Sequence, residues 1–189
     1  MYVLGIMGSP RVGGNSDILL DQALKGAAET GARTEKIILN QLSINGCNDC
    51  TGCNETGECL IDDDMQSILP RIREADYIIH ATPVYFWTLT SQMKAYLDRW
   101  TAFFDASWKW HKDYLKEMKG KKIGLITACG ETNTAECDPI ETIFNNLCKF
   151  CQLENMGAVK VSAYARGEVE NKKEALEEAY KLGKAGCDS

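Results

Sequence analysis

Four cysteines lie close together in this chain, and their spacing is typical of metal–sulfur chemistry. Two residues separate Cys47 from Cys50 and Cys50 from Cys53, and five residues separate Cys53 from Cys59. Four converging thiolates are what a [4Fe–4S] cluster requires. They also suit a tetrahedral zinc ion. The successive two-residue gaps resemble ferredoxin spacing more than the split pairs of zinc sites, so the sequence favours the cluster.

The length and charge of the chain bear on its class. A chain of 189 residues is long enough for one α/β domain and short for two. A net charge of −6 without a Lys/Arg cluster argues against a nucleic-acid partner. No apolar run approaches the length of a membrane span, and the first residues lack the pattern of a secretory signal. We therefore expect a cytoplasmic protein with no membrane or nucleic-acid partner.

The other five cysteines are scattered along the second half of the chain: Cys129, Cys137, Cys148, Cys151 and Cys187. Nine cysteines cannot all pair within one chain, and a reducing compartment favours ligands and free thiols over disulfides. We expect Cys129 and Cys148 to pack as small buried hydrophobes. Cys148 and Cys151 form a second C-x-x-C, but their expected mid-helix position gives no reason for a lowered thiol pKa.

Strand and helix patterns alternate along the whole chain. Short apolar runs predict five strands, at residues 2–8, 34–39, 76–82, 121–129 and 159–164. Amphipathic periodicity and polar starting residues predict five helices, at residues 16–30, 62–73, 90–104, 139–153 and 171–184. The alternation predicts a single α/β domain over residues 1–189, with a parallel sheet covered on both faces. The cysteines lie in a loop at 44–61, inserted after the second strand.

Ligands of such sheets bind at the carboxyl ends of the strands, so the loops after the first, third and fourth strands form the candidate site. The first loop carries glycines, polar side chains and one cation: Ser9, Arg11, Gly14, Asn15 and Ser16. Such a loop before a helix N-terminus is a cradle for an anion, and a phosphate is the anion we expect. It has neither the Lys-Ser/Thr of a Walker loop nor the Gly-x-Gly-x-x-Gly dinucleotide pattern. The alternative is a plain strand–helix turn in which Asn15 or Ser16 caps the helix.

The loops after the third and fourth strands differ in character. Residues 82–88 are aromatic and apolar, where loops are normally polar. This composition suits a flat heteroaromatic ligand or, alternatively, an interface or core cluster. Residues 127–132 are mostly small and leave room for a ring.

Taken together, these motifs resemble the NADPH-dependent FMN reductase family of flavodoxin-like proteins, and more closely its iron–sulfur flavoprotein branch. The resemblance covers essentially the whole chain. It rests on the cysteine loop leading into Asp63-Asp64-Met65 and on four other motifs: Gly8-Ser9-Pro10-Arg11, Gly14-Asn15-Ser16, Pro83-Val84-Tyr85-Phe86 and Lys94-x-x-x-Asp98-Arg99. It implies a flavodoxin-like three-layer sandwich whose five-stranded parallel sheet has the order 2-1-3-4-5.

The resemblance also implies cofactors, partners and site residues. The first loop would bind the FMN phosphate, and residues 83–87 and 127–131 would flank the isoalloxazine ring. The FMN-binding residues implied in this way are Ser9, Arg11, Gly14, Asn15, Ser16, Pro83, Val84, Tyr85, Phe86, Trp87, Thr127, Ala128, Cys129, Gly130 and Glu131. The cysteine loop would hold a [4Fe–4S] cluster near the flavin of an adjoining subunit, in a homodimer or homotetramer.

Three remaining features are interpreted as structural. The aromatic stretch at 100–114 is read as a subunit interface, as a wall over the flavin or, equally, as an extra buried helical hairpin. His80 is expected to pack in a strand against a helix, and the aspartates at 62–64 to cap a helix. Neither is assigned to catalysis, because FMN would carry the chemistry.

The favoured function is an FMN-dependent oxidoreductase that couples FMN to a [4Fe–4S] cluster and takes electrons from a ferredoxin-like donor. One alternative is a cluster-free reductase that uses NAD(P)H to reduce flavin, quinone or nitroaromatic substrates. Another is a non-catalytic FMN-binding redox sensor. A phosphatase is set aside, because no cysteine is followed by arginine at the six-residue offset of a phosphate-binding nucleophile loop.

Overall fold

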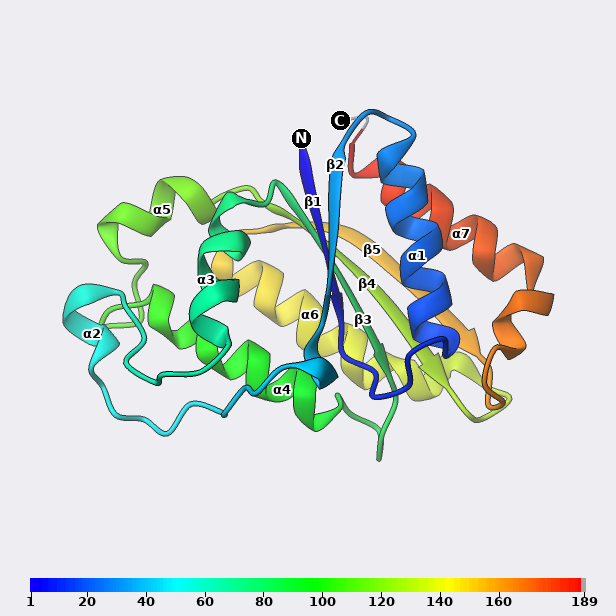
Figure 1. Ribbon diagram of the computed structural model, residues 1–189, viewed down its shortest axis with the longest axis horizontal. Helices are drawn as coiled ribbons and strands as arrows, with labels where there is room; N and C mark the ends of the chain where they lie inside the picture. Colours follow the sequence, from blue (N-terminus) through cyan, green and yellow to red (C-terminus); the bar gives the residue numbers. More distant parts are fainter. Residues whose placement is uncertain (188–189) are drawn as a thin grey trace.

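Five parallel strands form the centre of the protein in a computed structural model that describes residues 1–187. The strands are β1 (Tyr2–Met7), β2 (Arg33–Ile38), β3 (Tyr77–Pro83), β4 (Lys122–Cys129) and β5 (Glu154–Ser162). Their order in the sheet is β2-β1-β3-β4-β5, and every neighbouring pair is parallel (Figure 1). This is the doubly wound order of flavodoxin-like proteins, so the predicted fold class is confirmed.

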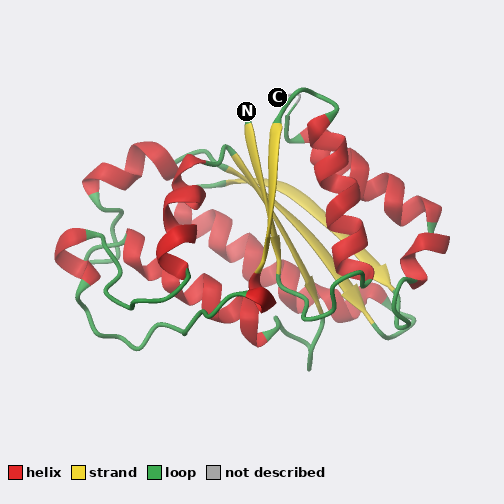
Figure 2. Cartoon of the chain, in the orientation of Figure 1, coloured by secondary structure: helices red, strands yellow, loops and turns green. Residues whose placement is uncertain are grey.

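Helices cover both faces of the sheet (Figure 2). The α-helices are α1 (Asn15–Ala28), α2 (Cys53–Thr56), α3 (Met65–Glu74), α4 (Ser91–Asp98), α5 (Lys112–Met118), α6 (Asp138–Cys151) and α7 (Lys173–Ala185). Short 3₁₀ segments are η1 (Leu39–Gln41), η2 (Arg99–Phe103), η3 (Thr134–Cys137) and η4 (Glu168–Asn171). No helix within residues 1–187 is both long and apolar enough to cross a membrane.

Two apolar layers hold the helices to the sheet, because successive residues of a strand point to opposite faces. In β1, Val3 and Met7 pack with α1 and α7, whereas Leu4 and Ile6 pack with α3, α4 and α6. All residues of β1 and β4 are buried, as expected for parallel strands covered on both sides. The layers fix the sheet so that the loops at the strands' carboxyl ends meet at one edge (Figure 1).

The last strand begins earlier than the sequence predicts. Strand β5 starts at Glu154, whereas apolar alternation indicated a start at residue 159. The register with β4 is irregular between Ile123 and Leu125, and Gly157 there has φ +97°. A bulge of this kind interrupts the alternation of side chains and admits a glycine, so the first half of β5 resembles a turn in sequence.

The region between β3 and β4 also differs from the prediction. The helix expected at 90–104 is α4 followed by the tighter turn η2, and the 105–120 segment contains the additional helix α5. Trp100, Phe103, Phe104 and Tyr114 are buried in the core on this side of the sheet. The third helix begins at Met65, three residues after the predicted start, and the side chains of Asp63 and Asp64 before it accept from the backbone N–H groups of Asn45 and Ser43.

Candidate functional site

A cavity of about 160 Å³ lies at the carboxyl-end edge of the sheet. We call it the sheet-end cavity; its lining residues are Ser9, Arg11, Gly14, Asn15, Ser16, Pro83, Val84, Tyr85, Ala128, Cys129, Gly130, Ala163, Tyr164 and Arg166. The structure therefore brings the predicted loops after β1, β3 and β4 together in one hollow, as parallel strands require.

The loop after β1 is folded so that backbone N–H groups can face an anion. The turn closes with the Gly14 N–H donating to the Arg11 carbonyl oxygen at 3.0 Å, and Gly13 has φ +70°. Gly14 is the N-cap of α1, so no side chain caps this helix start. A buried carboxylate of Asp17 accepts from the Gly13 N–H at 2.7 Å and pairs with Lys36, which fixes the loop from behind. Uncapped N–H groups and the positive end of the helix dipole favour a bound phosphate.

Asn15 lines the cavity, but its side chain is already engaged. Its amide nitrogen donates to the carbonyl oxygens of Ala163 and Ala165 at 3.0 and 2.9 Å. Its amide oxygen accepts from the Val169 N–H at 3.2 Å. Asn15 thus joins the loop after β1 to the loop after β5, so the side chain acts as a brace between the two loops.

The loop after β3 is a tight turn that exposes two large aromatic side chains. Tyr85 and Thr88 exchange backbone hydrogen bonds, and Phe86 and Trp87 between them have φ of 48° and 60°. Phe86 is 92% exposed and Trp87 62%. Bulky residues rarely adopt positive φ, and such outliers cluster at functional sites.

Four predicted residues do not line the sheet-end cavity. Phe86, Trp87 and Glu131 line an adjoining hollow of about 280 Å³ that shares Val84, Cys129, Gly130 and Tyr164 with it. Thr127 is fully buried within the sheet. The sequence reasoning missed three lining residues after β5, namely Ala163, Tyr164 and Arg166. The rule that ligands bind at strand carboxyl ends could have found them, since β5 is parallel and ends at the same edge.

A second hollow, of about 260 Å³, contains all four clustered cysteines. We call it the cysteine hollow; its lining residues are Cys47, Asp49, Cys50, Thr51, Cys53, Asn54, Cys59, Leu60, Ile61, Thr101, Phe104, Asp105, Ala106 and Trp108. It lies beside η2, away from the sheet edge, and shares no lining residue with the sheet-end cavity. The aromatic stretch at 100–114 borders this hollow and contributes no lining residue to the sheet-end cavity of the same chain. Helix α5 and the buried aromatic side chains agree with the alternative of an extra buried helical hairpin, whereas a subunit interface or a wall over a flavin stays a prediction.

Contacts from distant segments hold the cysteine loop in place. His111 Nε2 lies 3.0 Å from the Cys53 carbonyl oxygen, and Tyr114 donates to the Gly57 carbonyl oxygen at 3.2 Å. Thr101 donates to the sulfur of Cys47 at 3.6 Å. The first two contacts hold the loop by its backbone, and the third reaches a sulfur of a cysteine that lines the hollow.

The thiols are packed closely enough to influence one another. Burial, with an added contribution from the charges of the neighbouring thiolates, raises the pKa of the Cys53 thiol. Metal binding must therefore displace protons from this loop. Within the described part of the chain, no three His, Cys, Asp or Glu side chains converge closely enough to hold one ion.

The aspartates before α3 tie the loop to the helix. Asp64 accepts from the Ser43 N–H at 2.7 Å, and Asp63 accepts from the N–H groups of Asn45 and Met65 at 2.9 and 3.0 Å. Burial would raise the pKa of the Asp63 carboxyl, but these bonds and the Arg99 guanidinium outweigh it and hold that pKa below its usual range. Of the aspartates predicted to cap the helix, Asp63 binds the Met65 N–H at its start, whereas the N-cap residue Asp64 makes no side-chain cap hydrogen bond.

Comparisons with known proteins point to one family. The family described as NADPH-dependent FMN reductase matches residues 1–142. An iron–sulfur flavoprotein of Methanocaldococcus jannaschii is 46% identical over 99 residues, which are 52% of this chain and 51% of that protein. An iron–sulfur flavoprotein of Archaeoglobus fulgidus is 32% identical over 183 residues, covering 97% of this chain and 77% of that protein. The first of these alignments thus spans about half the length of the relative.

Among solved structures, the Trp repressor binding protein from Bacillus subtilis superposes with a TM-score of 0.70 at 24% identity. The superposition covers 96% of this chain and 98% of that one. At this level of identity the likeness supports the fold alone.

Proposed function

The chain belongs to the NADPH-dependent FMN reductase family, in its iron–sulfur flavoprotein branch, and from this we propose that it is an FMN-dependent oxidoreductase that couples FMN to a [4Fe–4S] cluster. One observation carries the proposal: four thiols face one hollow, and a separate anion cradle lies at the sheet edge of the same chain. We further propose that residues 1–189 form one domain, with the loop at 44–61 as an insertion after β2.

The sheet-end cavity fits FMN in its chemistry. The start of α1 and the cations Arg11 and Arg166 would bind the phosphate, because both side chains line the cavity beside uncapped N–H groups. Val84, Tyr85 and Gly130 would flank the ring, with the exposed turn at 86–87 beside it. FMN, when bound, supplies the capacity to exchange electrons one or two at a time.

The cysteine hollow suits a cluster better than zinc. A single zinc ion needs four donors within about 2.3 Å of one point. The four thiols border a hollow of about 260 Å³. Ligands of a [4Fe–4S] cluster bind separate irons, so they must stand around a volume of this kind.

The partners follow from the separation of the two hollows. Because they share no lining residue, we propose that the cluster of one subunit serves the FMN of another, in a homodimer or homotetramer. A ferredoxin-like protein would donate single electrons to the cluster. All nine cysteines are free thiols, which fits our placement of the protein in the reducing cytoplasm.

Anaerobic purification followed by an absorbance spectrum, with iron and acid-labile sulfide assays, tests the proposal. We expect flavin bands, a broad visible shoulder, and about four irons and four sulfides per chain. Cys50→Ser should remove the shoulder and the iron and leave FMN bound. Cys187→Ser, at the half-buried thiol outside the loop, is the matched control and should keep both. Wild-type protein with flavin and no sulfide would disprove the cluster.

A second candidate is a cluster-free NAD(P)H-dependent reductase. The adjoining hollow favours it, because the exposed aromatics Phe86 and Trp87 offer a surface on which a nicotinamide could stack beside the flavin. NADPH added anaerobically should then bleach the bound flavin within seconds. Bleaching in the Cys50→Ser variant at the wild-type rate would favour this candidate over cluster coupling.

A further inference from the structure

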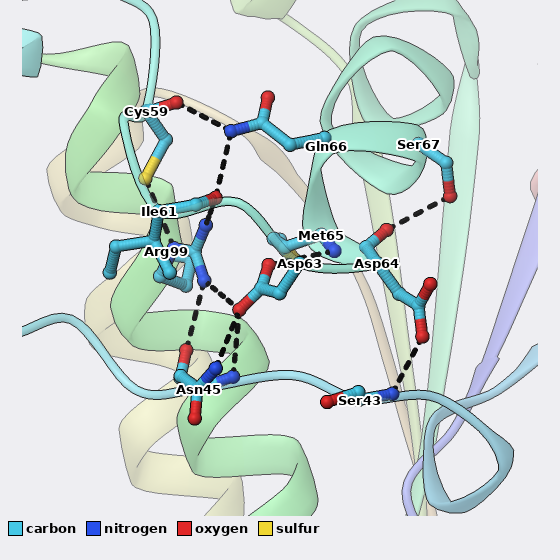
Figure 3. A network of polar contacts seen from close by, with 10 residues as sticks. All are labelled: Ser43, Asn45, Cys59, Ile61, Asp63, Asp64, Met65, Gln66, Ser67 and Arg99. Atoms are coloured by element: carbon cyan, nitrogen blue, oxygen red, sulfur yellow. Dashed lines mark hydrogen bonds and ion pairs between the residues drawn. The ribbon is translucent and has the colours of Figure 1, made fainter.

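Arg99, the first residue of η2, is a fully buried cation beside the cysteine loop (Figure 3). Its side chain is 0% exposed, and that of Asp63, with which it pairs at 2.7 Å, is 2% exposed. Arginine is almost never buried to this degree without partners that satisfy its donors. The positions of those partners therefore indicate what the residue does.

The donors of Arg99 reach both ends of the cysteine loop. One terminal nitrogen donates to the Asn45 carbonyl oxygen at 3.0 Å, ahead of the first cysteine. The other donates to the Ile61 carbonyl oxygen at 3.2 Å, beyond the last cysteine. Asp63 adds a further link, because its carboxylate accepts from Arg99 and from the Asn45 N–H. Together, Arg99 and Asp63 hold the two ends of the cysteine loop side by side.

The fourth contact is directed at a thiol. Arg99 Nε donates to the sulfur of Cys59 at 3.2 Å. The Asp63 carboxylate and the two carbonyl oxygens are enough to hold the two ends of the loop together, so the contact with Cys59 acts on the sulfur itself. A thiolate is a far better acceptor for a guanidinium than a neutral thiol, because charge-assisted hydrogen bonds are about twice as strong.

Cys59 is also fixed through its backbone. Gln66 donates to the carbonyl oxygens of Cys59 and Ile61 at 2.5 and 2.9 Å. By contrast, Cys47 and Cys50 are exposed, and the sulfur of Cys47 accepts only from a neutral hydroxyl among the contacts of residues 1–187. One corner of the cysteine hollow is therefore more rigidly held than the others.

We infer that Arg99 is a positioning residue for the fourth thiolate: it holds Cys59 in place before metal binds and donates to its sulfur afterwards. The inference rests on the proposed cluster. A positive donor at a ligand sulfur stabilises the more negative, reduced cluster, so it should raise the reduction potential. An arginine that only braced the loop would leave the potential of a bound cluster unchanged.

The test compares three variants as loaded protein. Arg99→Lys keeps the charge and loses the planar fork, so it should retain FMN and lower the cluster potential. The expected shift is about tenfold in the reduced-to-oxidised ratio at fixed potential, or about 59 mV for one electron. Asp63→Asn leaves the arginine charge less neutralised and should shift the potential upwards. Lys94→Gln, which breaks an exposed pair on the preceding helix, is the matched control and should leave it unchanged.

Hydrogen exchange on the cluster-free proteins supplies an independent readout. Arg99→Lys should speed exchange of the Asn45 amide and of amides in the 44–61 loop, and leave α1 and α7 unchanged. The inference is supported if Arg99→Lys loses iron, retains FMN and shows faster exchange in the loop. Loss of both cofactors from this variant overturns a loop-specific role. Wild-type potential together with wild-type loop exchange in Arg99→Lys also overturns it. If wild-type protein assembles no cluster, the proposed function fails, and the exchange measurement still decides whether Arg99 positions Cys59.

Discussion

At the scale of single residues, Arg166 is the side chain whose role is easiest to isolate. It lines the sheet-end cavity together with Arg11, and it donates to the Val12 carbonyl oxygen at 2.6 Å. We expect Arg166→Gln to weaken FMN binding about tenfold or more, because a hydrogen bond to a charged group contributes about 1.5–3 kcal/mol. Quenching of flavin fluorescence on titration into apoprotein measures the change.

Riboflavin provides the control for this prediction, because it lacks the phosphate. Its affinity should be the same in wild type and Arg166→Gln. An equal loss for both ligands would show that Arg166 acts by holding the loop at Val12 rather than by contacting phosphate.

His80 makes a prediction about stability against pH. It is fully buried in β3, with the rings of Tyr96 and Phe144 packed around it. Burial lowers its pKa from 6.5 to about 3. The unfolded chain therefore binds a proton that the folded chain does not between these two values, and the free energy of unfolding falls as the pH falls from 6.5 to about 3. The contribution is about 1.4 kcal/mol per pH unit over this window.

Urea unfolding between pH 4 and 6.5 checks the His80 prediction. The free energy of unfolding of His80→Phe should depend less steeply on pH than that of wild type, by the equivalent of about one proton. Comparing the two slopes cancels the contribution of the carboxylates to the pH dependence, because they titrate alike in both proteins. Parallel curves would mean that His80 accepts a proton in the folded state.

At the scale of secondary structure, the contact between α1 and α7 depends on a missing side chain. A Cβ at Gly183 would overlap the carbonyl oxygen of Ala23, so the two helices pack backbone to backbone. Gly183→Ala should destabilise the protein by about 1–3 kcal/mol by forcing them apart. The exposed Lys181→Ala on the same helix should change stability by less than about 0.5 kcal/mol. Equal melting temperatures for the two variants would contradict this packing.

The same scale shows why much of the fold, though not all of it, could be predicted from the sequence. Apolar runs such as Tyr2–Met7 are buried on both faces, so periodicity located β1 and the alternation with helices indicated the parallel sheet. The start of β5 was missed because the bulge at Gly157 interrupts that alternation. Helix α5 was predicted only as one alternative, an extra buried helical hairpin, because the aromatic residues around it equally resembled an interface. Arg99 belonged to a noted motif, but its contacts with residues 45, 59, 61 and 63 are tertiary, and no local pattern reveals them.

At the scale of the whole molecule, the two hollows lie in different parts of one chain: the cysteine hollow includes residues of α2, and the other lies at the sheet edge. Figure 1 shows α2 well apart from the carboxyl ends of the strands. If electrons pass between chains, two variants that are each inactive should complement one another. Cys50→Ser lacks the cluster and keeps FMN, whereas Arg11→Ala combined with Arg166→Ala keeps the cluster and binds FMN poorly.

Electron transfer between subunits is tested by mixing these two variants, dissociating their oligomers and letting the chains reassemble. In a symmetric dimer, half of the reassembled dimers would contain one chain of each variant. Each such mixed dimer would have one working pair of cluster and FMN out of two, so roughly one quarter of the wild-type rate should return. The readout is the rate of FMN reduction by a chemically reduced ferredoxin. No recovery, with mixed dimers shown to be present by mass spectrometry, would mean that each cluster serves the FMN of its own chain. The two hollows would then have to be bridged within one subunit through η2 and α4, and the oligomer would contribute stability alone.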